Sequence, residues 1–286
     1  MPNTTISRKP MDILLRILLI LAGVLAALVF LFWLGLQFKP APFAPFPRQS
    51  QPLETVPLPA GLPAPVERFY RAVYGERVPV ITSAVITGSA KLRPAGPAYL
   101  PSRFRFTHVA GQSYRHYIES TLFTIPIFQV NERYVDGVSR MVLPFSPVIE
   151  NDPKTNQGAN LGMWSESIWF PSIFITDPRV RWSPVDDQTA LLTVPFEDAT
   201  ETYVVRFDPE TGLIRYFESM RYHAADSPAK TLWINETLEW KDINGVKVSA
   251  VGGAIWMDSG TPWAIFTVED IAFNVDVEEY ILQQGP

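Results

Sequence analysis

The sequence contains no cysteine and only three histidines among its 286 residues. Without cysteine, the chain forms no disulfide and offers no thiolate to a metal or a substrate. Basic residues are outnumbered by acidic ones, with 24 Lys and Arg residues and 29 Asp and Glu residues. The resulting net charge of −5 is opposite in sign to the surface by which proteins bind nucleic acids. We therefore expect no nucleic-acid partner.

Motifs of catalysis and of cofactor binding are missing as well. The chain has no Gly-x-Ser-x-Gly, no P-loop and no Gly-x-Gly-x-x-Gly. Its histidines, His108, His116 and His223, lack the spacing of a metal site. His108 and His116 could meet across a hairpin, but two histidines without a third ligand make a poor site. We expect no metal, no cofactor and no catalytic residue, and hence no enzyme, with an unrecognised hydrolase as the remaining alternative.

The chain does contain a long apolar run near its N-terminus. Ile17 to Leu36 are 20 consecutive residues without a charge. At 1.5 Å per residue they extend about 30 Å, the thickness of a bilayer hydrocarbon core. A cleaved signal peptide, the alternative, has a shorter apolar region that ends at small residues, whereas this run ends in Phe-Trp-Leu-Gly-Leu. We therefore predict an uncleaved transmembrane helix.

The charges around the run predict its orientation. Arg8, Lys9 and Arg16 precede or begin it, whereas only Lys39 and Arg48 follow closely. This difference favours a cytoplasmic N-terminus by the positive-inside rule. The prediction is a single-pass protein of the cell membrane, with the lipid bilayer as a partner and the following domain outside the cytoplasm.

Proline dominates the next segment. Nine of the 26 residues from Pro40 to Pro65 are proline, which favours an extended, semi-rigid spacer. We expect Phe43 and Phe46 in this spacer to reach the membrane interface. The predicted organisation is a cytoplasmic tail at 1–16, a transmembrane helix at 17–36, a proline-rich linker at 37–65 and a β domain at 66–286.

The β domain begins with one helical pattern and continues with strands. Val66, Phe69, Tyr70 and Val73 have the i, i+3, i+4, i+7 spacing of an amphipathic helix. The later segments are rich in β-branched and aromatic residues and are bounded by Gly, Pro or Asn, as strands are. The predicted strands are 80–92, 103–109, 113–119, 125–133, 139–143, 180–182, 189–196, 201–207, 213–222, 231–240, 246–257 and 263–275.

Two loops between predicted strands indicate antiparallel pairing. Asp208-Pro-Glu-Thr-Gly212 has the length of a short hairpin loop, and Asn244-Gly245 is a strong signal for a two-residue turn. A sheet of about 10–12 strands does not stay flat and must curl, close or split into two layers. The fold class is therefore predicted as mostly β (α+β).

Aromatic residues gather between the two blocks of strands. Residues 158–174 lack alternation and are predicted to be helical up to Pro171. Trp164 and Ile168 lie four residues apart, so one helix face is strongly apolar. This face is either ordinary core packing or the lid of a hydrophobic ligand pocket. The pocket candidates are Tyr134, Trp164, Ile168, Trp169, Phe170, Trp182, Tyr216 and Trp233.

Two arginines that precede aromatic residues are candidates for the polar end of such a pocket. They occur in Arg181-Trp182 and Arg221-Tyr222. A guanidinium in this setting can hold a carboxylate or a phosphate. The alternative for each arginine is a surface salt bridge.

Short motifs also occur in a characteristic order along the domain. In the C-terminal half they are Val205-Arg-Phe-Asp-Pro-Glu-Thr-Gly-Leu213, Trp240-Lys-Asp-Ile-Asn-Gly-Val-Lys-Val248 and Val268-Glu-Asp-Ile-Ala-Phe-Asn274. This order resembles LolA and LolB, the carriers of bacterial lipoprotein localisation. Further motifs are Pro63-Ala-Pro-Val-Glu-Arg-Phe-Tyr-Arg71, Tyr134-Val-Asp-Gly137, Glu166-Ser-Ile-Trp-Phe-Pro171 and Val180-Arg-Trp182. With these, the domain is more similar still to a bacterial membrane-anchored family defined only as a domain of unknown function.

The resemblance to LolA and LolB implies a curved antiparallel half-barrel with one or two helices on its concave face. It also implies a lipid or another hydrophobic ligand, such as an acyl chain, that is bound without chemistry. The chain departs from these carriers in its apolar N-terminal helix, and their functional arginine has no clear counterpart in it. The alternative is a structural or protein-interaction domain whose core is filled by its own side chains.

Overall fold

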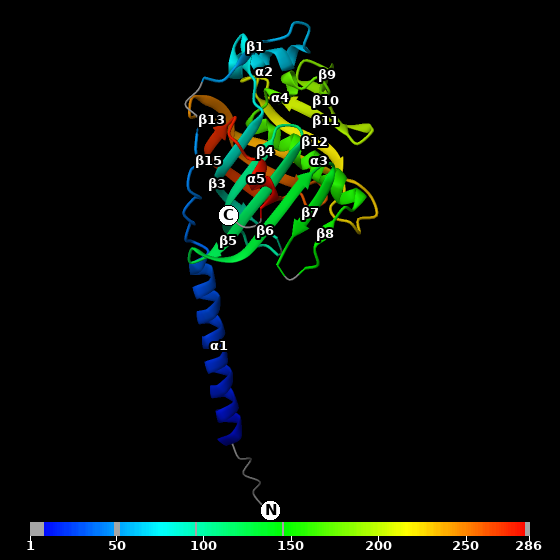
Figure 1. Cartoon of the computed structure of the whole chain (residues 1–286). Coiled ribbons are helices and arrows are strands. Elements are labelled where there is room, and N and C mark those ends of the chain that lie inside the picture. Colours follow the sequence, from blue (N-terminus) through cyan, green and yellow to red (C-terminus); the bar gives the residue numbers. More distant parts are fainter. Residues whose placement is uncertain (1–8, 49–51, 95, 145, 284–286) are drawn as a thin grey trace, which may run out of the picture.

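The computed structural model describes residues 9–48, 52–94, 96–144 and 146–283. Figure 1 shows a long helix, α1 (Lys9–Gly35), that projects from one end of a β domain. Within the described residues, Asp12–Gly35 is the one helical stretch long and apolar enough to cross a membrane. Residues 1–8 of the predicted tail lie outside the described part of the chain.

The β domain is built on one antiparallel sheet, and a small second sheet lies beside it. The strands are β1 (Thr55–Pro57), β2 (Arg77–Pro79), β3 (Ser83–Leu92), β4 (Leu100–Val109), β5 (Ser113–Leu122), β6 (Ile125–Val135), β7 (Val138–Val142), β8 (Ile149–Glu150), β9 (Arg181–Pro184), β10 (Thr189–Phe196), β11 (Ala199–Phe207), β12 (Ile214–Arg221), β13 (Thr231–Ile243), β14 (Val246–Trp256) and β15 (Pro262–Phe273). The large sheet has thirteen strands in the order β8-β7-β6-β5-β4-β3-β15-β14-β13-β12-β11-β10-β9, and β1 pairs with β2. Because β8 and β9 do not pair with each other, the large sheet is not closed.

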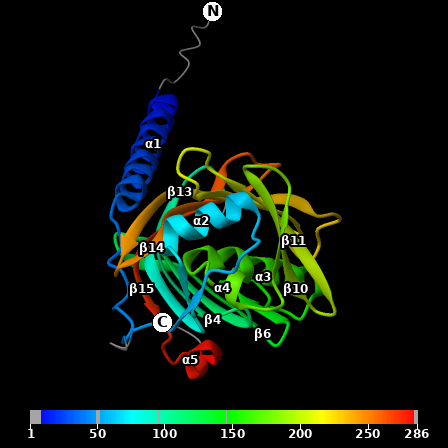
Figure 2. The same ribbon diagram turned by 90° about the horizontal axis from the view of Figure 1, so that it is seen from above.

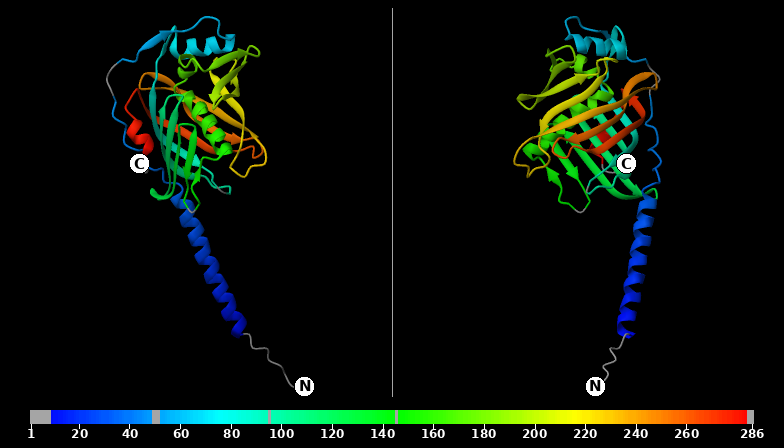
Figure 3. Two further views of the ribbon diagram at one scale, coloured as in Figure 1. Left: turned by 45° about the vertical axis from the view of Figure 1, so that its right-hand side comes forward. Right: turned by 180° about the vertical axis from the view of Figure 1, so that it is seen from behind.

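The predicted mostly β fold is confirmed, and the size of the sheet explains its curvature. A twisted sheet of this many strands curls, and here it wraps around α3 (Pro153–Glu166) (Figure 3). The chain continues from α3 into η1 (Ser167–Trp169) and α4 (Ile173–Thr176), with the expected break at Pro171 between them. Helix α5 (Glu278–Leu282) lies on the outer face of the sheet (Figure 2).

Capping residues explain why α3 begins before the predicted start at residue 158. The Asp152 carboxylate accepts hydrogen bonds from the backbone N–H groups of Lys154 and Thr155, and Pro153 occupies the first turn, where no N–H is required. Gly158 and Gly162 lower the intrinsic helix propensity of α3. Since most of its side chains are buried, packing inside the curved sheet stabilises it instead.

Helix α2 (Ala64–Tyr74) covers the end of the half-barrel that is remote from α1 (Figure 1). Its stripe of Val66, Phe69 and Tyr70 is fully buried in the main core, as the spacing predicts. The Tyr70 hydroxyl also donates a hydrogen bond to the carbonyl of Pro171 at 2.8 Å. This end of the half-barrel is therefore closed by side chains.

The proline-rich segment is extended, as predicted, but it lies against the convex face of the sheet. Arg103 donates a hydrogen bond to a backbone carbonyl of this segment and lies over the Phe43 ring. Phe43 is 8% exposed and packs on Tyr117, while Phe46 packs on the ring of Tyr280. The prediction that Phe43 and Phe46 reach the membrane interface is therefore wrong, because the sheet offers these rings an apolar and cationic surface.

The turns follow their sequence signals. Asn244 and Gly245 take positive φ values of 54° and 81° between β13 and β14, as a two-residue hairpin turn requires. Gly212 likewise has a φ of 71° in the loop between β11 and β12. Each predicted strand has a counterpart in the structure, and the strands that the pattern missed, β1, β2 and β8, are very short.

Candidate functional site

The concave face of the sheet and the α3–η1 segment enclose a mainly apolar cavity of about 310 Å³. Leu92 at the end of β3 and Leu143 just after β7 mark its outer end. By strand register these positions lie at the same end of the half-barrel as the β5–β6 turn. In that turn, the Phe123 N–H donates a hydrogen bond to the carbonyl of Gly35 in α1 at 3.1 Å. The cavity therefore extends toward the end of the domain that carries α1.

Exposed apolar side chains surround this same end. Ile125 and Ile127 at the start of β6 are 66% and 46% exposed. Phe123 in the preceding turn, Val148 after β7 and Met257 after β14 are also exposed. These five residues, which we call the apolar rim, come from separate turns and strand ends. An apolar surface gathered at one end of a domain marks a contact with an apolar partner.

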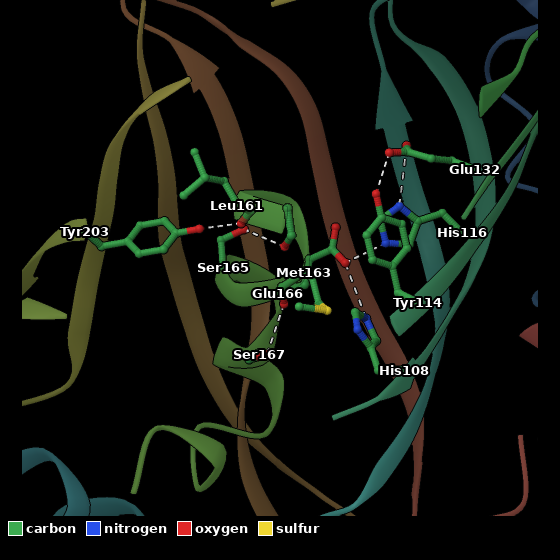
Figure 4. Close-up of polar contacts among 11 residues, drawn as sticks. His108, Tyr114, His116, Glu132, Leu161, Met163, Ser165, Glu166, Ser167 and Tyr203 are labelled. Carbon is green, nitrogen blue, oxygen red and sulfur yellow. Dashed lines mark hydrogen bonds and ion pairs between the residues drawn. The ribbon is translucent and has the colours of Figure 1, made fainter. Parts of the chain in front are cut away.

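Charged groups converge at the other end of the cavity, where His116, Glu132 and Glu166 line it. Figure 4 shows these side chains. The Nε2 atom of His116 lies 2.6 Å from Oε2 of Glu166, and Nε2 of His108 lies 3.3 Å from the same oxygen. In the β4–β5 register, His108 and His116 are diagonal neighbours, so their side chains project from one face of the sheet. Glu166 comes from the last turn of α3. The curvature of the sheet around α3 thus assembles this group.

Two further side chains hold His116 in place. Glu132 is directly opposite His116 in the β5–β6 pair, and its Oε2 lies 3.7 Å from the Nδ1 atom of His116. The Tyr114 hydroxyl donates a hydrogen bond to Oε1 of Glu132 at 2.5 Å. The rings of Phe106 and Tyr114 stack on the two sides of the imidazole, each with its centroid 4.0 Å away. The imidazole is therefore fixed by rings and carboxylates together.

Burial and ion pairing determine the charges in this group. Burial alone lowers the pKa of His116, but the charge of Glu166 and the contacts with Glu132 and Glu166 outweigh it and raise the pKa to about 9. Burial raises the pKa of Glu166, but the charge of His116 and the contacts with the two histidines lower it to about 2. Burial lowers the pKa of His108, only partly opposed by Glu166. At neutral pH, His116 is thus a cation between two carboxylates, and His108 is neutral.

Arg221, on the β12 side of the cavity, is a different kind of charged group. Its guanidinium carbon lies 4.4 Å from the centroid of the Trp233 ring. It packs on α3, where a Cβ at Gly158 would lie 3.1 Å from Nε of Arg221, so the glycine leaves room for it. Gly162, one turn further, is its next neighbour on the helix. The guanidinium makes no hydrogen bond or ion pair with any described residue, and its Nε is buried.

The charges of the His116 group and of Arg221 balance each other without direct contact. His116 with Glu132 and Glu166 carries a net charge of −1 at neutral pH, and Arg221 carries +1. The charge of Arg221 accordingly helps to lower the pKa of Glu132, after burial, which raises it, and the contact with His116, which lowers it. The donors of the guanidinium nevertheless have no acceptor among the described side chains, so this arrangement leaves them to water or a ligand.

The structure brings four of the ten predicted site residues to the cavity wall. These are Ile168 and Trp169 on η1, Arg221 on β12 and Trp233 on β13. Three other candidates, Trp164, Phe170 and Tyr134, are buried in the core beside the cavity. The last three, Arg181, Trp182 and Tyr216, lie on β9 and β12 outside the lining.

Sequence reasoning did not assign His116, Glu132 or Glu166 to a site. It found no third ligand for His108 and His116, because Glu166 is 50 residues from His116 along the chain. Strand register would have placed Glu132 opposite His116. The position of Glu166 depends instead on how α3 sits inside the half-barrel, which no local pattern specifies.

Sequence comparison decides the family. A model described as "Family of unknown function (DUF6544)" matches residues 52–268. The chain belongs to this family. The predicted membership in a family of unknown function is therefore confirmed. Among curated proteins, no sequence matches the chain.

Solved structures of low sequence identity are similar to this chain. A LolA superfamily protein from Nitrosomonas europaea matches with a TM-score of 0.47 and 12% identity, over 78% of this chain and 99% of that chain. A domain assigned to outer membrane lipoprotein sorting from Vibrio parahaemolyticus has a TM-score of 0.42 and 11% identity, over 76% and 92% of the two chains. A DUF1329 family protein from Desulfovibrio piger has a TM-score of 0.41 and 10% identity, over 71% of this chain and 90% of that chain. At these values the likeness says nothing of a ligand.

Proposed function

We propose that this chain is a membrane-tethered domain that binds a lipid or another amphiphile in its cavity, without chemistry. The observation that carries the proposal is Arg221, a guanidinium in the wall of a mainly apolar cavity whose donors have no acceptor among the described residues. Guanidinium groups bind carboxylates and phosphates through paired hydrogen bonds. The ligand would place an anionic head at Arg221 and an acyl chain against the apolar walls.

The size of the cavity supports a ligand over a self-filled core. At about 310 Å³, its volume lies at the lower end of the range of roughly 300–1,000 Å³ for small-molecule sites. Trp169, Phe106 and Phe266 provide aromatic walls. A structural or protein-interaction domain would have no need to leave such a space beside an arginine that has no acceptor among the described residues.

The position of the cavity supports a ligand that comes from the membrane. We propose that α1 is an uncleaved anchor with a cytoplasmic N-terminus, which the positive charges before it favour. The β5–β6 turn, which contacts α1, then lies at the bilayer surface, and the apolar rim faces the lipid. A lipid would reach the cavity from this end without crossing water.

The test compares an anionic with a neutral amphiphile. The full chain in a nonionic detergent is titrated with dodecanoic acid and with dodecanol, and binding is read by native mass spectrometry. We expect Arg221→Gln to weaken the binding of dodecanoic acid by about 10- to 100-fold, the value of a charged hydrogen bond. The binding of dodecanol should stay nearly unchanged. The matched control is Arg181→Gln, because Arg181 is exposed on the edge strand β9. This variant is expected to retain wild-type binding.

Two results would contradict the proposal. One is equal affinity of the wild type and Arg221→Gln for the acid. The other is a wild-type chain that binds neither amphiphile.

A further inference from the structure

The arrangement of His108, His116 and Glu166 has the form of a metal-binding site. One atom from each residue, a ring nitrogen of each histidine and a carboxylate oxygen of Glu166, can be chosen so that all three lie within 4.8 Å of one another. The two Nε2 atoms approach the same oxygen, Oε2 of Glu166, at 3.3 and 2.6 Å. Figure 4 shows these side chains pointing toward one another from β4, β5 and α3.

His108 supplies an independent observation that points to a ligand. Its side chain is fully buried, and neither ring nitrogen has a hydrogen-bond partner among the described residues. The 3.3 Å contact of Nε2 with Glu166 lacks hydrogen-bond geometry. A buried polar atom without a partner destabilises the fold, and a missing ion is one of its ordinary explanations. A metal bound at Nε2 would satisfy this atom.

The two distances from the histidines to Glu166 are close to those around a tetrahedral ion. Zn²⁺ binds His nitrogen at about 2.0–2.1 Å and carboxylate oxygen at a similar distance, so its ligand atoms lie about 3.4 Å apart. The separation of His108 and Glu166 already has this value. His116 and Glu166, now 2.6 Å apart, must separate by several tenths of an ångström. His116 must also release the proton on Nε2 to solvent, because only the neutral imidazole binds a metal.

The surroundings of His116 are those of a metal-bound histidine. Glu132 lies behind the Nδ1 atom of His116, and Tyr114 orients Glu132 by a hydrogen bond. Metal-bound histidines commonly have such a carboxylate at their second nitrogen. His116 and Glu166 line the cavity, so a fourth coordination position would open into it. Two histidines and one glutamate with an open position form a ligand set that is typical of zinc.

We propose that His108, His116 and Glu166 bind a divalent transition-metal ion, Zn²⁺ first, whose fourth position faces the cavity. The ion would be held between the sheet and α3, and its open position would take water or an anionic group. The inference goes beyond the proposed ligand binding, which needs no metal, so its failure leaves the Arg221 site untouched.

The experiment uses the full chain in detergent after treatment with a chelator. Equilibrium dialysis against Zn²⁺, with metal analysis of the retained protein, is expected to show one ion per chain. Co²⁺ in place of Zn²⁺ is expected to give the visible absorption of a four-coordinate ion. His108→Asn and Glu166→Gln are each expected to weaken the binding of Zn²⁺ by about 100-fold. His223→Asn is the matched control, because His223 lies outside the cluster and pairs with Asp258.

The Co²⁺ spectrum of the wild type keeps the test independent of variant folding. A wild-type chain that binds no Zn²⁺ and gives no four-coordinate Co²⁺ spectrum overturns the proposal. The same holds if His108→Asn binds as tightly as the wild type, or if His223→Asn alone loses the ion.

Discussion

The charged groups at the two sides of the cavity are neutralised in different ways. His116 is in contact with Glu132 and Glu166 at 3.7 and 2.6 Å. Arg221 contacts aromatic rings and α3, and it forms no ion pair with any of the described residues. Removing one member of a buried ion pair destabilises the fold, because the other charge is left buried without compensation. A charge balanced only at a distance keeps its donors free for a ligand. We therefore attribute a structural role and the proposed metal site to the side of His116, and ligand recognition to the side of Arg221.

The largest expected difference between the two sides is in stability. Glu166→Gln leaves the buried His116 cation with one carboxylate, so we expect the free energy of unfolding to fall by about 3 kcal/mol. Arg221→Gln removes a group that contacts aromatic rings but forms no ion pair with a described residue, and we expect a change within about 1 kcal/mol. Urea unfolding of the full chain in detergent with a chelator, followed by tryptophan fluorescence, measures both. Equal losses in the two variants would end the distinction.

The pH dependence of stability sharpens the same comparison. The pKa of His116 is raised in the folded state from its ordinary 6.5 to about 9, so its stabilising contribution is complete below pH 6.5 and is lost as the pH rises through 9. The pKa of Glu166 is lowered from 4.5 to about 2, so its contribution is complete above pH 4.5 and is lost as the pH falls through 2. We expect unfolding experiments between pH 6.5 and 9 to show falling stability in the wild type.

The control for this pH dependence is Glu166→Gln. In this variant the pKa of His116 loses its main source of elevation, so the fall between pH 6.5 and 9 should be smaller than in the wild type. Arg221→Gln should retain the wild-type slope in that range. A slope that is the same in the wild type and Glu166→Gln would show that the ion pair is not the cause.

The smallest expected effect concerns the space beside Arg221. A Cβ at Gly158 would lie 3.1 Å from Nε, so Gly158→Ala must shift the guanidinium slightly. We expect binding of dodecanoic acid to weaken by about threefold, while helix propensity raises the stability by up to about 1 kcal/mol. Titration calorimetry and urea unfolding measure the two effects. A variant that binds the acid more weakly and is also less stable would mean that the whole helix has moved.

The fold was largely predictable because its signals are local. Alternation gave the strands, Asn244-Gly245 gave a hairpin, and the spacing of Val66, Phe69 and Tyr70 gave the buried face of α2. The start of α3 was missed although Asp152 and Pro153 are ordinary capping residues. The path of the proline-rich segment was missed because it depends on the distant Arg103 and Tyr117.

The site was predictable only in part, because its residues meet through curvature. Arg221 could be proposed locally, because it precedes the aromatic Tyr222, and Trp233 could be proposed as one of the aromatic residues on the predicted strands. Whether Arg181 or Arg221 faces the cavity depends on which strand lies at the sheet edge. Glu166 reaches His116 only because α3 lies inside the half-barrel, and this position follows from the whole sheet.

The measurement that tests the central claim most directly is whether the cavity itself holds an amphiphile. The delipidated full chain is incubated with dodecanoic acid and analysed by native mass spectrometry. Val130→Trp fills the cavity from β6, and Leu238→Trp, an exposed position on β13 outside the lining, is its control. The account predicts one bound acid per chain in the wild type and Leu238→Trp, and none in Val130→Trp. No bound acid in the wild type, or equal binding in all three proteins, would contradict it.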